Sequence, residues 1–208
     1  MKKILLLVAL VLLPVIGFSQ NDGLFSLENG KHLTFRDVPI DGSLNAFIAQ
    51  IEVKGFTSLY TADDYQGAVL SGRFIGKDVK LIIITTPKTK TVWKVAVKFE
   101  DQRNWYSLKS DYTELKSSLT VKYGGPTSYE FFSSPYEEGD GYEMTAIYAE
   151  KCVYTSFFEI KENGVVIGYL SLSINKNDSQ GYVSLSYEDS TNAAIMRSEK
   201  DANMYDEL

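Results

Sequence analysis

The segment from Val69 to Glu100 constrains the fold of this chain more than any other stretch. It contains three runs of strand-forming residues, Val69–Ile75, Val79–Thr86 and Thr91–Glu100, which are separated by short turns. Pro87 lies in the second turn, where its missing N–H leaves the sheet intact. The segment therefore predicts three consecutive antiparallel strands.

Two of these strands differ in how they distribute apolar side chains. In the last strand, Trp93, Val95, Val97 and Phe99 alternate with Lys94, Lys98 and Glu100. Such a period of two is typical of a strand with one buried face. In the middle strand, the run Leu81–Ile84 is apolar at every position. This is typical of an interior strand covered on both sides, or covered on one side and shielded on the other by long side chains.

Two amphipathic helices are predicted, one on each side of this meander. In the first, Leu44, Phe47, Ile48 and Ile51 share one face, Asp41 or Ser43 begins the helix, and Gly55 followed by Phe56 ends it. The second helix spans 107–122 and is stopped by Gly124, Gly125 and Pro126. Its apolar stripe is Leu108, Tyr112, Leu115, Leu119 and Tyr123.

Other stretches give weaker signals. The sequence predicts an N-terminal hairpin over residues 24–35, whose turn contains Asn29-Gly30, and four further strands at 143–148, 151–160, 165–174 and 182–188. The polar stretches 57–68 and 127–142 are predicted to be loops. The segment after Asp189 is predicted to be a mostly disordered tail with at most a short helix.

The order of elements predicts an α+β fold made of two helix-plus-antiparallel-meander repeats, with the helices packed on one face of the sheet. The first repeat, with the N-terminal hairpin, would occupy residues 20–106. The second would occupy 107–189, and the tail 190–208. The two helix exits also look alike, because Thr57-Ser58 follows Gly55 and Thr127-Ser128 follows Gly124.

The first 19 residues are typical of a secretory signal peptide. Lys2 and Lys3 precede an apolar run over residues 4–16, which ends before a small-residue cleavage site. Cleavage after Ser19 would leave 189 residues. It would also remove Lys2 and Lys3, so the net charge would change from −6 to −8. We therefore expect a periplasmic or secreted protein. It would have no membrane anchor after cleavage and, because it is acidic, no affinity for nucleic acid.

The residue types that dominate catalytic and metal centres are scarce. His32 is the only histidine, which excludes a metal site built on several histidines, and Cys152 is the only cysteine, so no internal disulfide forms. Cys152 lies in an alternating run that favours a small buried residue. The acidic run 137–143 offers oxygen ligands to a cation, or carboxylates to a hydrolase, but its spacing is not that of a calcium-binding loop. We expect no cofactor.

The favoured function is non-catalytic binding of a protein or glycan through the sheet or its loops. Tyrosines are frequent on the predicted strands, and tyrosine offers a large contact area with little loss of entropy. The candidate binding residues are Trp93, Lys94, Tyr154, Tyr169 and Tyr182. A hydrolase that uses the acidic residues near 137–143 and a purely structural envelope protein are the alternatives.

Several short segments resemble known proteins. The segments 39–44, 70–74 and 86–90 resemble an uncharacterised group of small secreted proteins from gut Bacteroides, which implies no particular activity. Asp189-Ser190-Thr191 is similar to the O-glycosylation sequon of such bacteria, so Ser190 is a candidate glycosylation site. The order of elements alone is similar to that of the β-lactamase inhibitor protein and of BamE-like periplasmic modules, a likeness that carries no function.

Overall fold

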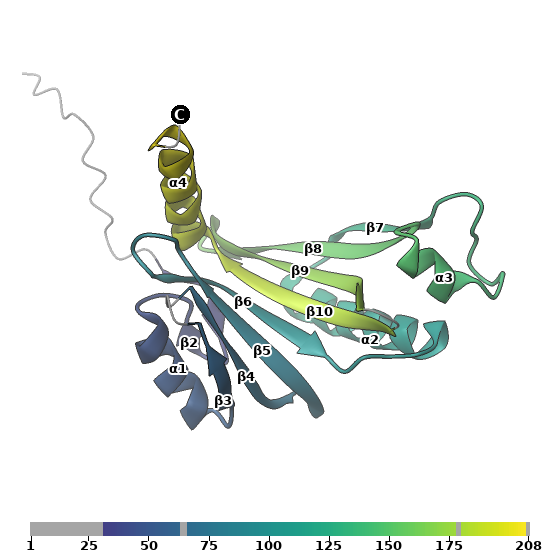
Figure 1. Ribbon diagram of the computed structural model, residues 1–208, viewed down its shortest axis with the longest axis horizontal. Coiled ribbons are helices and arrows are strands. Elements are labelled where there is room, and N and C mark those ends of the chain that lie inside the picture. The colour runs from purple at the N-terminus through teal and green to yellow at the C-terminus, as the bar shows by residue number, and fades with distance from the viewer. Residues whose placement is uncertain (1–30, 63–65, 178–179, 207–208) are drawn as a thin grey trace, which may run out of the picture.

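An antiparallel sheet of eight strands, in the order β3-β4-β5-β6-β10-β9-β8-β7, is the framework of the described chain (Figure 1). The computed structural model describes residues 31–62, 66–177 and 180–206, so the predicted signal peptide and residues 24–30 of the predicted hairpin lie outside the described residues. The sheet strands are β3 (Thr57–Thr61), β4 (Gly67–Phe74), β5 (Lys77–Thr85), β6 (Val92–Phe99), β7 (Thr127–Phe132), β8 (Cys152–Glu162), β9 (Val165–Asn177) and β10 (Gln180–Asp189). The four helices are α1 (Leu44–Val53), α2 (Trp105–Tyr123), α3 (Glu143–Tyr148) and α4 (Ser190–Asp206). Near the N-terminus, β1 (Thr34–Phe35) pairs with β2 (Val38–Pro39).

The core lies against one face of the sheet, which we call the inner face. A single row crosses five strands on this face, and each of its side chains is fully buried: Leu70, Leu81, Val97, Leu185 and Leu172 stand opposite one another in that order. The neighbouring positions form the outer face, whose side chains are mostly partly exposed. Burial on one face and exposure on the other agree with the predicted alternation.

Both predicted helices form, and their termini follow the predicted chemistry. Ser43 begins α1, and its Oγ accepts the N–H of Ala46. At the other end, the N–H of Gly55 donates to the carbonyl of Glu52 and that of Phe56 to Ile51, which is a Schellman ending. Phe56 is buried beside Gly72, where an added Cβ would lie 2.5 Å from the Phe56 ring. This contact holds the end of α1 against the inner face.

Helix α2 covers the half of the inner face formed by β8, β9 and β10. The Oδ1 of Asn104 accepts the N–H of Ser107 and caps its first turn. The predicted stripe is confirmed: Leu108, Tyr112, Leu115 and Leu119 are buried and Tyr123 is packed against the core. Gly181 lies beneath Leu108, so close that a Cβ at this position would meet the leucine at 2.5 Å.

Four sequence predictions were wrong at the level of secondary structure. Residues 57–61 and 127–132 are not loops but the two edge strands, because an edge strand needs pairing on one side only and tolerates polar residues. Residues 143–148 form α3 rather than a strand, since a short apolar run does not distinguish the two. The predicted disordered tail is helix α4, which begins where the Asp189 carboxylate accepts the N–H of Asn192. No helix among the described residues is long and apolar enough to cross a membrane.

Helices α3 and α4 lie at opposite ends of the sheet (Figure 1). Helix α4 follows β10 and contacts β6 and β9, while α3 contacts β8, β9 and β10 at the other end. Near α4, the register between β5 and β6 shifts, so that Val92 rather than Trp93 occupies the buried position. This bulge explains why the predicted alternation of Trp93 with Val95 is wrong at Trp93.

Candidate binding surface on the outer face

Four aromatic side chains stand on the outer face of three neighbouring strands and are about half exposed. They form what we call the aromatic patch: Tyr129 (53% exposed) and Phe131 (47%) on β7, Phe157 (46%) on β8, and Tyr169 (45%) on β9. The register places them on one face, since Tyr129 is opposite Thr155 and Glu159 is opposite Tyr169. The rings of Tyr129 and Phe157 meet edge to face at 6.4 Å.

The size of the aromatic patch lies in the range where patches are often functional. A buried aromatic side chain removes roughly 150–250 Å² from water, so four half-exposed rings present about 400 Å². The largest apolar patch on a monomeric protein usually measures about 300–600 Å². Small hydroxyl side chains, Thr155, Ser171 and Ser173, lie between the rings on the same face and give it polar groups that could accept or donate hydrogen bonds.

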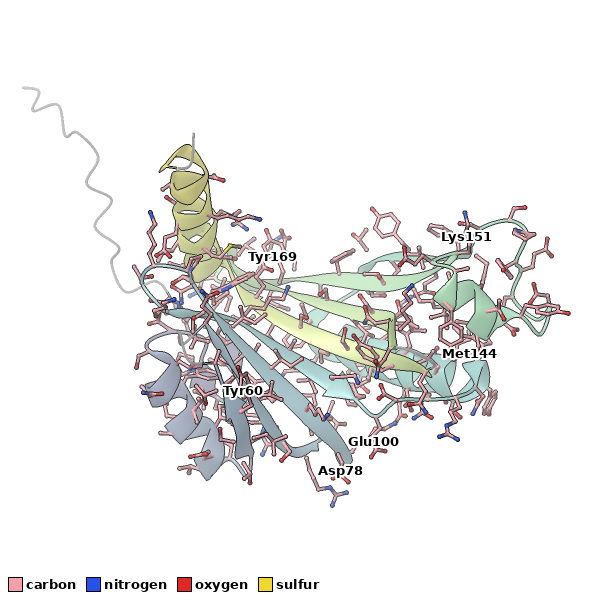
Figure 2. The ribbon with its side chains drawn as sticks, in the orientation of Figure 1. Tyr60, Asp78, Glu100, Met144, Lys151 and Tyr169 are labelled. Atoms are coloured by element: carbon pink, nitrogen blue, oxygen red, sulfur yellow. The ribbon has the colours of Figure 1, made fainter. Side chains whose placement is uncertain are left out.

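The structure separates the residues that the sequence proposed for binding. Tyr169, Tyr182 and Lys94 lie on the outer face, as their register shows. Figure 2 shows Tyr169 near the base of α4, and Met144 and Lys151 at the other end of the sheet. Trp93 lies at the β6 bulge, with the Nζ of Lys94 at 5.5 Å from its ring. Lys94 also lies 3.6 Å from the Glu188 carboxylate.

Tyr154 does not belong to this surface. It is buried on the inner face, within an aromatic cluster with Trp105, Tyr112 and Phe132. Its hydroxyl donates to Glu138 at 3.1 Å, and burial raises its pKa well above the usual range of a tyrosine. Tyr154 is therefore a core residue, although it lies on a strand as predicted.

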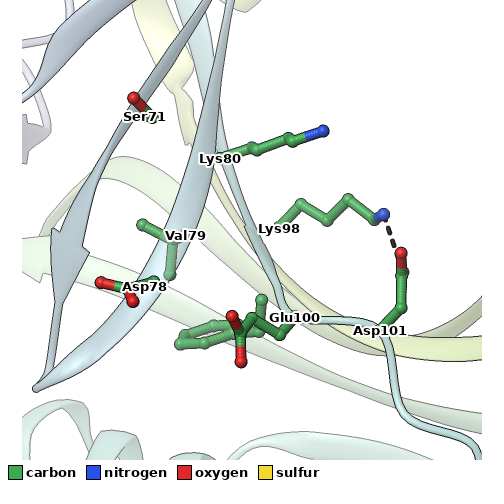
Figure 3. A pocket seen from close by; sticks show the side chains of 8 residues that line it. Ser71, Asp78, Val79, Lys80, Lys98, Glu100 and Asp101 are labelled. Atoms are coloured by element: carbon green, nitrogen blue, oxygen red, sulfur yellow. Dashed lines mark ion pairs between the residues drawn. The ribbon is translucent and has the colours of Figure 1, made fainter.

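A hollow of about 500 Å³ opens on the outer face at the far end of β4, β5 and β6 (Figure 3). Lys80 and Lys98 stand opposite each other on β5 and β6, and Figure 3 shows them extending in the same direction. The Nζ of Lys98 lies 2.8 Å from Asp101 and 4.4 Å from the ring centre of Tyr182. Because the carboxylates of Asp78, Glu100 and Asp101 also line the hollow, its charge is mixed rather than basic.

The acidic run 137–143 uses its carboxylates to shape its own loop. Asp140 accepts the N–H groups of Glu137 and Tyr142, and Glu143 accepts that of Gly139. The hydrogen bond from Lys109 lowers the pKa of Glu138, which also accepts from Tyr154. Within the described residues, no group of three or more acidic, histidine or cysteine side chains is arranged to hold a metal ion.

His32 and Cys152 do not meet. His32 lies beside Asp189, the last residue of β10. Asp189 pairs with Gly168 of β9, and Gly168 pairs with Ile160 of β8. Cys152 is eight residues away along β8, roughly 26 Å at the rise of a strand. Burial raises the pKa of the Cys152 thiol to about 12. A nucleophilic thiol needs a lowered pKa, and the pKa of this thiol is raised.

Ser190, the candidate glycosylation site, begins α4. Its Oγ is buried, although the residue as a whole is partly exposed. A glycosyl group on this oxygen would require the start of α4 to open, so the prediction now implies modification before folding.

Sequence reasoning missed Tyr129, Phe131 and Phe157. The first two were missed because residues 127–142 were predicted to be a loop, on the basis of Pro135 and the acidic run that follows it. A signal was present, since Tyr129 and Phe131 alternate with Ser128 and Glu130. Phe157 also had a local signal, because it shares the parity of the charged residues Glu159 and Lys161, while Phe158 and Ile160 occupy the buried positions.

Comparison of this chain with family models, with curated proteins and with solved structures finds no match. The function must therefore be argued from the geometry described above.

Proposed function

We propose that this protein is secreted or periplasmic and binds a protein or glycan partner, without catalysis, through the aromatic patch on the outer face of its sheet. The observation that supports this most directly is the grouping of Tyr129, Phe131, Phe157 and Tyr169 on one face, each about half exposed. Rigid aromatic rings stack on sugar rings and serve as anchors in protein interfaces. The hydroxyls between them offer the polar contacts that such ligands need.

The contacts of the acidic loop 137–143 support the same proposal. The acidic loop is held by its own hydrogen bonds, and Glu138 is engaged by Lys109, Trp105 and Tyr154. Carboxylates committed in this way are poorly placed to exchange protons with a substrate. For this reason we favour a binding function over a hydrolase that uses the acidic loop.

The test compares two variants that remove exposed aromatic side chains. Phe157→Ser with Tyr169→Ser removes two rings from the aromatic patch, and Tyr106→Ser removes one that is 83% exposed on α2. Binding would be measured on a glycan array and by cross-linking in envelope extract. We expect at least tenfold weaker binding for the double variant and unchanged binding for Tyr106→Ser. Equal binding by all three proteins would refute the assignment to this face.

We also propose that the chain arose by duplication of a helix-plus-meander unit, with the helices of both units on the inner face. In the sheet order, β3 to β6 is followed by β10 to β7, so the last strands of the two units, β6 and β10, meet at the centre. Both edge strands begin with Thr-Ser after a helix ended by glycine. Superposition of α1–β6 on α2–β10 is the test, and helices falling on opposite faces after superposition would contradict it.

A further inference from the structure

Strand β7 is an open edge that lacks the usual protection. Its six residues contain neither proline nor lysine, and its register with β8 is unbroken from Thr127 to Phe132. The opposite edge differs, because β3 has a register shift between Ser58 and Tyr60. Natural sheets protect their edges with bulges, prolines or lysines, since unpaired N–H and C=O groups recruit another strand. A flat edge without these features needs a partner or carries a risk of aggregation.

The register shows which main-chain groups of β7 are open. The N–H of Ser133 donates to the carbonyl of Lys151 at 2.7 Å, just beyond the end of the strand. Hydrogen-bonded pairs alternate in an antiparallel ladder, so Phe131, Tyr129 and Thr127 also bond to β8. The N–H and C=O groups of Ser128, Glu130 and Phe132 therefore point towards the open edge.

The side chains of β7 make this edge nearly neutral in an acidic chain. Glu130 is its only charged residue. Its Oε1 lies 2.6 Å from the Nζ of Lys116 and accepts a hydrogen bond from Tyr112 at 3.0 Å. On the outer side, Tyr129 and Phe131 expose about half of their surface at the rim. Two copies of the mature chain, whose predicted net charge is −8, can therefore approach here with little repulsion.

We propose that β7 pairs antiparallel with β7 of a second copy of this chain, in a register centred on Tyr129. In this register Tyr129 faces Tyr129 of the second copy, and Ser128 faces Glu130. The open groups of Ser128 and Glu130 then form two hydrogen-bonded pairs. A register centred on Glu130 would instead place two carboxylates opposite each other, and like charges directly opposite destabilise a sheet.

A second copy fits this edge because the strand is complementary to itself. Each copy presents the same rim of two aromatic side chains, and the symmetric register stacks Phe131 against Thr127 beside the central tyrosines. Tyr129 and Phe131 of the two copies together supply about 400 Å² of apolar surface. Even with the paired strand backbones added, the buried area stays below the roughly 1,200 Å² at which standard protein interfaces begin. The dimer is therefore weak and forms only at high protein concentration.

Sedimentation of the full mature chain over a series of concentrations tests the dimer. We expect a reversible monomer–dimer equilibrium for the wild type, which Tyr129→Lys abolishes by placing two lysines opposite each other. The matched control is Tyr60→Lys on β3, which alters an equally exposed edge tyrosine and should leave the dimer intact. A wild type that stays monomeric to about 1 mM, or a dimer lost in both variants, overturns the proposal.

A cysteine pair tests the register, with Cys152→Ser as the background to remove the native thiol. Tyr129→Cys should form a disulfide between copies, because residues in a non-hydrogen-bonded pair lie about 4.5 Å apart at Cα. Glu130→Cys should not, since its two copies would lie about 8 Å apart, beyond disulfide reach. The opposite pattern overturns the Tyr129-centred register. The dimer does not depend on Phe157 or Tyr169, so the proposed binding function can fail while the dimer stands.

Discussion

The Nδ1 of His32 lies 3.1 Å from the Oδ1 of Asp189, a carboxylate whose side chain is completely buried. Asp189 ends β10 and also accepts the N–H groups of Leu33 and Asn192, each at 2.9 Å. The amide of Asn192 in turn donates to the carbonyls of Ile40 and Val92. These contacts join the N-terminal segment, the β6 bulge region and the start of α4, and the Leu33–Asp189 contact spans 156 residues of sequence. They explain how α4 is fixed at its base.

Replacing Asp189 with alanine should strongly destabilise the protein. The change leaves two buried N–H groups without an acceptor, and we expect a loss of about 3 kcal/mol in the free energy of unfolding. Asp189→Asn keeps one acceptor oxygen and should lose less. Urea unfolding followed by circular dichroism measures both. Asp78→Ala is the control, since the side chain of Asp78 is exposed and makes a surface ion pair with Arg73 at 3.4 Å, and it should change stability by less than about 0.5 kcal/mol. Equal losses for Asp189→Ala and Asp78→Ala would contradict the role of the buried cluster.

Gly72→Ala should destabilise the contact between α1 and the sheet. The added Cβ would lie 2.5 Å from the Phe56 ring, which is buried and has little room to move. Overpacking of this kind costs about 1–3 kcal/mol. Gly125→Ala is the matched control, because its Cβ would meet no atom within 4 Å. Thermal unfolding of the two variants measures the difference. If Gly72→Ala is as stable as Gly125→Ala, the Phe56 ring moves to make room for the added Cβ.

The central strands and helices α1 and α2 could be predicted from the sequence because their signals are local. The alternation of Val95, Val97 and Phe99 and the 3.6-residue spacing from Leu108 to Leu119 both extend over several turns or residues. The elements that were missed are short or depend on distant partners. Strand β7 becomes a strand only by pairing with β8, and α4 is held by a carboxylate that also binds Leu33.

The candidate site was only partly predictable for a related reason. Tyr169 and Tyr182 were proposed correctly as strand tyrosines, but nothing local says which face of the sheet each one joins. Tyr154 lies on β8, where Val153, Tyr154 and Phe157 place apolar or aromatic groups on both faces. The alternation of Phe158 and Ile160 with Glu159 and Lys161 is the one local signal that separates these faces, and the register with β9 agrees with it.

Cys152 should react slowly with thiol reagents in the folded protein. Burial raises its pKa to about 12, and the negative charge of Glu138 acts in the same direction. At pH 8 the thiolate fraction is then reduced about a thousandfold from that of an ordinary cysteine. We expect alkylation by iodoacetamide at least a hundredfold slower in native protein than in guanidinium, with Cys152→Ser as the blank. Comparable rates in both conditions would show that the thiol is accessible and ionised.

Glu138 should contribute stability that is lost at low pH. The hydrogen bond from Lys109 lowers the pKa of Glu138 below its value in the unfolded chain. A carboxyl group of this kind stabilises the fold above the unfolded pKa, near 4.5, and the contribution disappears as the pH falls through the folded pKa. Because the pair is partly exposed, Glu138→Gln should cost less than about 1 kcal/mol at pH 7.

The neighbouring Glu137 offers the control for this pH dependence. Glu138 accepts hydrogen bonds from Lys109, from Trp105 at 3.4 Å and from Tyr154 at 3.1 Å, whereas the Glu137 side chain shares none of these three contacts. Urea unfolding of wild type, Glu138→Gln and Glu137→Gln between pH 7 and pH 3 measures the difference. The gap between wild type and Glu138→Gln should close as the pH falls, because protonation removes the charge that Lys109 stabilises. If the difference in stability persists at pH 3, the loss in Glu138→Gln comes instead from the hydrogen bonds of Trp105 and Tyr154 to Glu138.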